Sequence, residues 1–127
     1  MRAELGTRAF AQCVDGWLVW TVSRWQSSNE TPIVSAGATG WNPESFPGLN
    51  GGGSYFCMGP NGRFLPTLRA EAIRDGIEDH CLFSLLKASD DPRAKALLAG
   101  LDPTRTAYDA ATQRRLRRQA FKILNRE

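Results

Sequence analysis

Residues 66–80, with the sequence PTLRAEAIRDGIEDH, decide how this chain is organised. Pro66 and Thr67 form a helix start signal, since a threonine hydroxyl can accept a hydrogen bond from a free backbone N–H group. Behind them, apolar side chains recur every four residues and predict one buried stripe on a helix over residues 67–88: Ile73, Ile77, Cys81 and Leu85, with Leu82 and Leu86 beside them. Gly76 costs such a helix about 1 kcal/mol relative to alanine, so we expect close backbone packing there.

Length and charge limit the remaining possibilities. A chain of 127 residues is one domain at most, whether whole or a fragment. The net charge is +3, and residues 103–127 hold seven Arg or Lys against Asp109 and Glu127. We therefore treat residues 91–127 as a helical basic tail. No run of about 18 apolar residues predicts a transmembrane helix, and the N-terminus lacks the apolar segment of a secretory signal, so the sequence leaves the compartment open.

The cysteines predict neither a disulfide framework nor a zinc site. Cys13, Cys57 and Cys81 are an odd number without paired spacing. Buried free thiols are the favoured interpretation. We expect no metal and no cofactor.

The N-terminal region has the pattern of an α/β protein. Residues 2–14 can form a short helix, which Asp15 and Gly16 end. Residues 17–22, WLVWTV, are apolar or β-branched throughout, which is typical of a strand buried on both faces of a parallel sheet. A helix, a turn, a buried strand and a later long helix predict an α/β fold.

The middle and the end of the chain differ in character. Residues 26–66 read as a long irregular loop rich in proline and glycine, within which residues 54–65 can form a short hairpin around the Asn61-Gly62 turn. Two further helices are predicted at 92–99 and at 105–125. Asp91 and Pro92 provide the cap and the first residue of one, and Asp102-Pro103-Thr104 repeats this start signal before the other.

The carboxylates of the central helix are the first candidates for chemistry: Glu71, Asp75, Glu78 and Asp79. Glycoside hydrolysis needs two carboxyl groups that face each other across a substrate, and neighbours on one helix rarely do so. Because Arg69 and Arg74 are interleaved with the acids, ion pairing is the favoured interpretation, and we assign Arg69, Asp75, Gly76 and Asp79 structural roles.

The other polar motifs are also interpreted as structural, and not as sites of chemistry. His80 is the only histidine and has no second histidine for a metal and no nucleophile motif beside it. Gly51-Gly52-Gly53 lacks the lysine and the spacing of a phosphate loop. The basic run of residues 114–122 can contact nucleic acid or an acidic surface, although a solvated helix face is favoured and no nucleic-acid motif accompanies it.

Tryptophans are the remaining candidates for ligand contact. Trp20 lies late in the predicted strand and Trp25 just beyond it, where ligands of α/β sheets bind. Flat aromatic faces suit sugar rings, and for these two residues core packing and ligand contact both stay open. Trp41, on the long loop, is added to them, whereas Trp17 is assigned to the core.

Several of these segments together resemble a known domain. Residues 16–20, 51–59 and 67–80 occur in the order found in a C-terminal domain of unknown function of proteins related to glycoside hydrolase family 123, which includes β-N-acetylgalactosaminidases. The resemblance covers about residues 10–90. Thr67 and His80 stand where that family usually has serine and tyrosine.

The resemblance implies the end of a (β/α)8 barrel. Residues 17–22 would be its last strand, residues 26–66 its last loop and residues 67–88 the closing helix. A whole barrel takes about 250 residues, and the family's catalytic Asp-Glu pair would lie upstream, since this chain contains no Asp-Glu dipeptide. The chain is thus expected to be the carbohydrate-related end of a glycoside-hydrolase-like protein, inactive alone and associated with the missing barrel or with itself.

An alternative hypothesis comes from the charge distribution alone. The chain would be a non-enzymatic interaction module whose basic C-terminal helix binds an acidic partner or nucleic acid. Of these two partners, the sequence does not favour nucleic acid.

Overall fold

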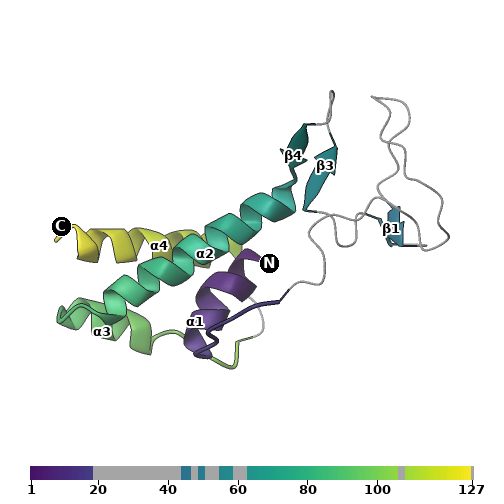
Figure 1. Cartoon of the computed structure of the whole chain (residues 1–127). Helices are drawn as coiled ribbons and strands as arrows, with labels where there is room; N and C mark the ends of the chain where they lie inside the picture. Colours follow the sequence, from purple (N-terminus) through teal and green to yellow (C-terminus); the bar gives the residue numbers. More distant parts are fainter. Residues whose placement is uncertain (19–43, 47–48, 51–54, 59–62, 106–107, 127) are drawn as a thin grey trace. The chain divides into compact units, whose positions relative to one another are not determined.

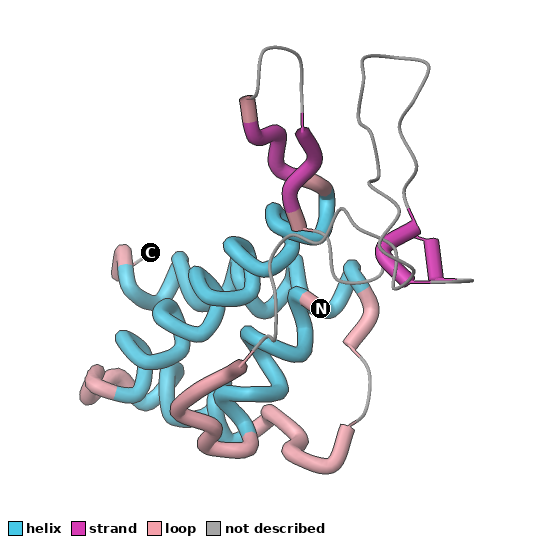
Figure 2. Tube along the Cα trace, turned by 45° about the vertical axis from the view of Figure 1, so that its right-hand side comes forward, coloured by secondary structure: helices cyan, strands magenta, loops and turns pink. Residues whose placement is uncertain are grey.

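The computed structural model describes residues 1–18, 44–46, 49–50, 55–58, 63–105 and 108–126 (Figure 1). The chain divides into two compact units, one formed by residues 1–17 and 72–127 and the other by residues 18–71. Most of the described residues are helical and appear in cyan in Figure 2. Residues 91–127, which the sequence sets apart as a basic tail, belong to the first unit together with most of the central helix.

The first unit begins with a helix from Arg2 to Ala11. Its first part, η1 (Glu4–Arg8), has the wider hydrogen-bonding pattern of a π-helix, and α1 (Ala9–Ala11) continues it. The helix predicted at residues 2–14 is therefore present but ends earlier. It ends because Cys13 has a φ angle of 54°, which lies outside the right-handed helical region.

The other three helices match their predicted positions to different degrees. The central helix α2 (Leu68–Lys87) and the short helix α3 (Pro92–Ala99) confirm the predictions at 67–88 and 92–99. Asp91 caps α3 by accepting a hydrogen bond from the backbone N–H of Arg93 at 2.7 Å. Helix α4 (Ala110–Leu124) begins later than the predicted residue 105 because Asp109, and not Asp102, provides its N-cap.

The core of the first unit lies between α2, α3 and α4. Its buried side chains are Leu82, Phe83 and Leu86 from α2, Ala94 from α3, Leu116, Ala120 and Ile123 from α4, and Leu101 and Tyr108 from the connecting segment. The hydroxyl of Tyr108 donates to the carbonyl of Asp102 at 2.9 Å, which ties this segment back on itself. The N-terminal helix joins the core through Phe10, whose ring lies 5.5 Å from that of Phe83.

The predicted apolar stripe of α2 divides into a buried row and an exposed row, which point about 100–120° apart around the helix. Leu82 and Leu86 are buried as expected, but Ile77 is 53% exposed and Leu85 60% exposed. Cys81 is also exposed. The expectation of one buried stripe is therefore wrong for the row Ile77, Cys81 and Leu85, because the other helices of this unit pack on the side of Gly76, Asp79 and Phe83.

The second unit contains short antiparallel strands. Strands β1 (Glu44–Phe46) and β2 (Leu49–Asn50) pair with each other. Strands β3 (Phe56–Met58) and β4 (Phe64–Pro66) form a hairpin, which confirms the one predicted at 54–65. After it, the hydroxyl of Thr67 donates to the carbonyl of Tyr55 at 2.8 Å and accepts from the N–H of Ala70 at 3.4 Å. Thr67 thus provides the predicted helix start.

The α/β part of the prediction requires correction where the chain is described. Trp17 and Leu18 are in no strand and are 50% and 90% exposed, so the buried strand predicted at 17–22 does not begin there. Trp17 is likewise not a core residue. Residues 19–22 lie outside the described residues. In the part of the chain that the structure describes, the fold is mostly helical and contains no barrel.

Candidate functional site

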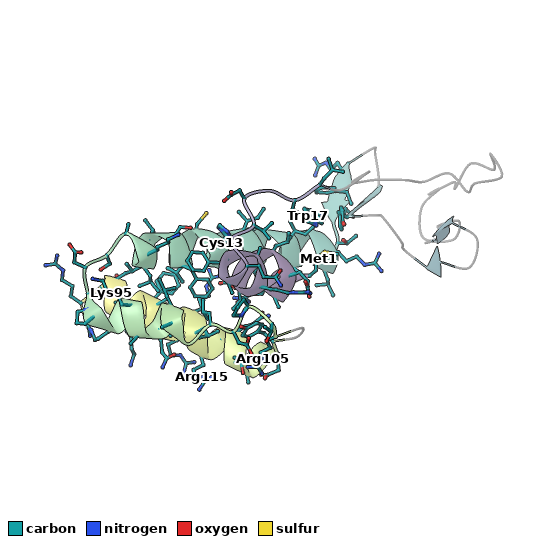
Figure 3. All side chains as sticks on the ribbon, turned by 90° about the horizontal axis from the view of Figure 1, so that it is seen from below. Met1, Cys13, Trp17, Lys95, Arg105 and Arg115 are labelled. Carbon is teal, nitrogen blue, oxygen red and sulfur yellow. The ribbon has the colours of Figure 1, made fainter. Side chains whose placement is uncertain are left out.

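An apolar groove of about 500 Å³ lies between the N-terminal helix and the exposed row of α2. Leu5 and Ala9 line it from the N-terminal helix, Ile77 and Cys81 line it from α2, and Val14, Gly16 and Trp17 line it from the segment that follows the N-terminal helix. Figure 3 shows Trp17 beside α2. The volume of the groove falls in the range of ligand-binding clefts.

The polar side chains around this groove largely pair within the protein. Arg8 donates to Glu4 at 2.8 Å, and the side-chain amide of Gln12 donates to the carbonyl of Pro103 at 2.9 Å. His80 packs edge-on against Phe10, with ring centroids 5.5 Å apart. The groove therefore offers mainly apolar surface, which favours a packing partner over a polar ligand.

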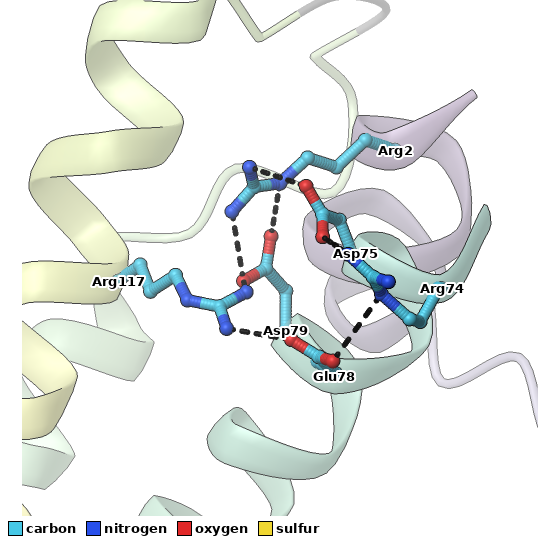
Figure 4. Close-up of polar contacts among 6 residues, drawn as sticks. All are labelled: Arg2, Arg74, Asp75, Glu78, Asp79 and Arg117. Atoms are coloured by element: carbon cyan, nitrogen blue, oxygen red, sulfur yellow. Dashed lines mark hydrogen bonds and ion pairs between the residues drawn. The ribbon is translucent and has the colours of Figure 1, made fainter. Parts of the chain in front are cut away.

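A second cluster joins three helices through ion pairs (Figure 4). Asp79 of α2 is 2% exposed and accepts from Arg2 of the N-terminal helix at 2.7 Å and from Arg117 of α4 at 2.8 Å. Around it, Arg117 also donates to Glu78 at 2.7 Å and Arg2 to Asp75 at 3.2 Å. The hydrogen bond to Asp79 raises the pKa of the Arg2 guanidinium, and the bond to Glu78 raises that of Arg117.

The geometry of this cluster is that of a scaffold. Both oxygens of Asp79 accept hydrogen bonds from arginines, and Asp75 and Glu78 each have an arginine partner. The three carboxylates lie on one helix and do not face each other across an open space. Pairing and hydrogen bonds of this kind offset the desolvation penalty of buried charged groups.

Two glycines bring the helices of this cluster close together. A Cβ atom on Gly76 would lie 2.8 Å from the carbonyl oxygen of Arg2, and one on Gly6 would lie 2.9 Å from the carbonyl oxygen of Gly76. The expected close approach at Gly76 thus has the N-terminal helix as its partner, and not a barrel or a loop. The short distance between the backbones allows Arg2 to reach Asp79.

A third feature is a cationic groove of about 370 Å³ on α4. Its lining residues are Arg2, Asp75, Arg114, Arg117, Arg118 and Phe121. Arg2 and Arg117 belong to the ion-pair cluster. In the described part of the chain, no carboxylate pairs with Arg114 or Arg118, and both side chains are exposed.

The structure brings together only some of the residues singled out by sequence. Asp75, Gly76 and Asp79 meet at the crossing of the N-terminal helix with α2, whereas Arg69 is exposed near the start of α2 in the second unit. Trp20, Trp25 and Trp41 lie outside the described residues.

Cys13 and Cys81 are exposed free thiols. The expectation that the thiols are buried is therefore wrong for these two, because neither side chain points into the core.

Sequence reasoning missed the residues that complete the cluster. Arg2, Gly6 and Arg117 come from helices far from α2 in sequence. Arg117 belongs to the basic run of residues 114–122, but nothing in the local context of these three residues indicates a contact with α2. The available signal was Gly6, a second glycine within a predicted helix, where it lies between the larger residues Leu5 and Thr7. A pair of glycines in two helices can indicate a close crossing.

Among the described residues, no group of three His, Cys, Asp or Glu side chains gathers closely enough to hold a metal ion. None of the described helices combines the length and apolar character needed to cross a membrane. Comparisons of the chain with protein families, curated proteins and solved structures found no match.

Proposed function

We propose that this chain is a non-catalytic terminal part of a carbohydrate-related, glycoside-hydrolase-like protein, in which its apolar groove packs against the β-sheet of a (β/α)8 barrel. The observation that carries the proposal is the second apolar row of α2. Ile77, Cys81 and Leu85 are exposed, and they point about 100–120° around the helix from the core residues Leu82 and Leu86. A helix whose apolar surface extends beyond the side that is buried in its own unit is suited to contact a second layer of structure.

The proposal gives the apolar row one partner. In a barrel, each helix covers strands with an apolar face, and aliphatic side chains such as Ile77 and Leu85 are suited to that contact. Because Trp17 and Leu18 are in no strand, the last strand of that sheet would begin no earlier than residue 19, in a segment outside the described residues. The resemblance of residues 16–20, 51–59 and 67–80 to the family 123-related domain supports a barrel sheet as the partner of the apolar row.

The proposal also assigns no catalytic role to the carboxylates of α2. Asp75, Glu78 and Asp79 are paired with arginines, which supports a structural role. Trp20, Trp25 and Trp41 remain candidates for stacking on a sugar. We expect the isolated chain to release no product from an aryl-N-acetylhexosaminide, and turnover that is lost on mutating one of its carboxylates would contradict this.

The decisive experiment is co-purification with the barrel. The chain is co-expressed with the protein encoded immediately upstream of it, and the complex is isolated through a tag on that protein. The wild-type chain should co-purify, and the double variant Ile77→Glu/Leu85→Glu should not, because two charges would have to enter an apolar contact. Leu68→Glu is the matched control, since Leu68 is 89% exposed at the start of the same helix.

Two results would overturn the proposal. One is an upstream region that encodes no barrel. The other is a wild-type chain that stays monomeric in sedimentation and does not associate with the barrel, because an exposed apolar row of this length should otherwise drive either that contact or self-association.

A further inference from the structure

The exposed face of α4 carries charges that the fold does not use. Helix α4 contains five basic residues and no acidic residue. Arg117 is committed to Asp79 and Glu78. Four further basic side chains are exposed and have no ion-pair partner in the described part of the chain: Arg114, Arg115, Arg118 and Lys122.

These four side chains lie on one side of the helix. Arg114, Arg118 and Lys122 follow each other at intervals of four residues, which places their Cβ atoms about 5–6 Å apart in a row about 12 Å long. Figure 3 shows Arg115 at the outer side of α4. Like charges at this spacing destabilise a helix by a few tenths of a kcal/mol per pair. The row therefore lowers the stability of α4 slightly, and a bound anionic partner would relieve this repulsion.

An aromatic ring lies at the edge of the same row. Phe121 is 45% exposed and lines the cationic groove together with Arg114 and Arg118. The guanidinium of Arg117 covers the ring at 5.6 Å from its centroid and so holds it in place from one side. The acid of this groove, Asp75, is paired with Arg2 and Arg74.

We propose that this face of α4 binds single-stranded nucleic acid, with Arg114, Arg118 and Lys122 along the phosphates and Phe121 stacked on a base. Arginine suits phosphate because its planar guanidinium donates two parallel hydrogen bonds. A row of cations beside an exposed aromatic ring is the combination that binds single strands without sequence preference. An acidic protein surface would pair with the cations and cover the ring by apolar contact. A single strand uses both features in one repeating pattern, with its phosphates along the row of cations and a base stacked on the ring, which is why nucleic acid is the favoured partner.

The test is fluorescence anisotropy with a labelled oligothymidylate of about 12 nucleotides, a length within the usual site size for single strands. At about 20 mM salt the wild-type chain should bind, and the affinity should fall steeply as salt is added. The double variant Arg114→Gln/Arg118→Gln should bind at least about tenfold more weakly, and its salt slope should decrease by about 1.4, because each phosphate contact to a single strand contributes about 0.7.

A charge-matched control separates this site from non-specific attraction. Lys87→Gln/Lys95→Gln removes the same charge from exposed positions on α2 and α3, and it should bind nearly as tightly as the wild-type chain. Phe121→Leu keeps an apolar side chain against Arg117 but removes the stacking face, and it should weaken binding about tenfold. Far-UV circular dichroism establishes that each variant is folded.

Three results would overturn the proposal. The first is no binding at low salt. The second is an equal loss in the two double variants, which would mean general electrostatic attraction. The third is competition by polyglutamate at concentrations as low as those of the oligonucleotide together with no effect of Phe121→Leu, which would assign the face to an acidic protein.

Discussion

Replacing Gly76 with alanine tests whether the crossing of the N-terminal helix with α2 requires the absence of a side chain. The new Cβ would lie 2.8 Å from the carbonyl oxygen of Arg2 and 3.0 Å from the Cβ of Leu5. In an unobstructed helix the same change would stabilise the protein by about 1 kcal/mol, because alanine is the better helix former. The sign of the measured effect therefore shows which of the two terms is larger.

The steric term should win. The nearest atom is a backbone oxygen, which cannot rotate away, so the two helices must separate. Overpacking of this kind costs about 1–3 kcal/mol, and the separation also moves Arg2 away from Asp79, whose bond is 2.7 Å long. After the gain in helix propensity is subtracted, we expect a net loss of about 1–2 kcal/mol, which lowers the melting temperature of a body of this size by about 4–16 °C.

Urea unfolding followed by far-UV circular dichroism measures this difference. Gly16→Ala is the control, because nothing lies within 4 Å of a Cβ at that position, and its free energy of unfolding should change by less than about 0.5 kcal/mol. Gly6→Ala should resemble Gly76→Ala, since its Cβ would lie 2.9 Å from the Cβ of Asp79. If Gly76→Ala were as stable as the wild-type chain or more so, the close crossing would be refuted.

Two further variants test the polar contacts of the first unit. Asp79→Asn should lower the free energy of unfolding by about 2 kcal/mol, which is less than for a fully buried pair because Arg2 and Arg117 are partly exposed. Glu4→Gln is the control in an exposed pair and should lower it by less than about 0.5 kcal/mol. Equal losses for the two variants in urea unfolding would contradict the reasoning. Asp109→Ala tests the cap of α4: hydrogen bonds from Thr112 lower the pKa of Asp109 below the usual 3.8, so its contribution is present above that value and is lost as the pH falls through the lowered one. The melting temperature of this variant should therefore lie below that of the wild-type chain at about pH 7, and the difference should shrink as the pH falls below 3.8, whereas a difference that stays constant in acid would show that the cap acts without its charge.

The parts of the fold that could be predicted from sequence depend on neighbouring residues. Asp91 followed by Pro92 gives a cap and a first helical residue, and α3 begins at that point. Thr67 bonds to Ala70, three residues away. Turn chemistry likewise indicated the hairpin of β3 and β4. Such signals act over a few residues, so a single sequence contains them.

The side of α2 that is buried could not be predicted in this way. Ile77 and Leu85 are as apolar as Leu82 and Leu86, so composition favours neither row. The choice depends on which side the N-terminal helix and α4 approach, and that is set by Gly6 against Gly76 and by Arg2, which lies 77 residues from Asp79. For the same reason, the acids of α2 could be assigned to ion pairs with Arg74 of the same helix, but their partners on the other helices, Arg2 and Arg117, could not be named. That α2 is the closing helix of a barrel stays a prediction.

The distribution of side chains around α2 separates scaffolding from recognition. Asp75, Glu78 and Asp79 pair with arginines of two other helices. A change such as Asp79→Asn therefore acts on stability. The exposed apolar row of α2 and the basic face of α4 have no role in that cluster, so changes there should act on binding while leaving the free energy of unfolding nearly unaltered. It follows that the two proposed contacts are independent: Ile77→Glu/Leu85→Glu should still bind the oligonucleotide, and Arg114→Gln/Arg118→Gln should still co-purify with the barrel. If either pair abolished both activities, the two faces would form one surface, and the division of roles argued from the ion-pair cluster would be wrong.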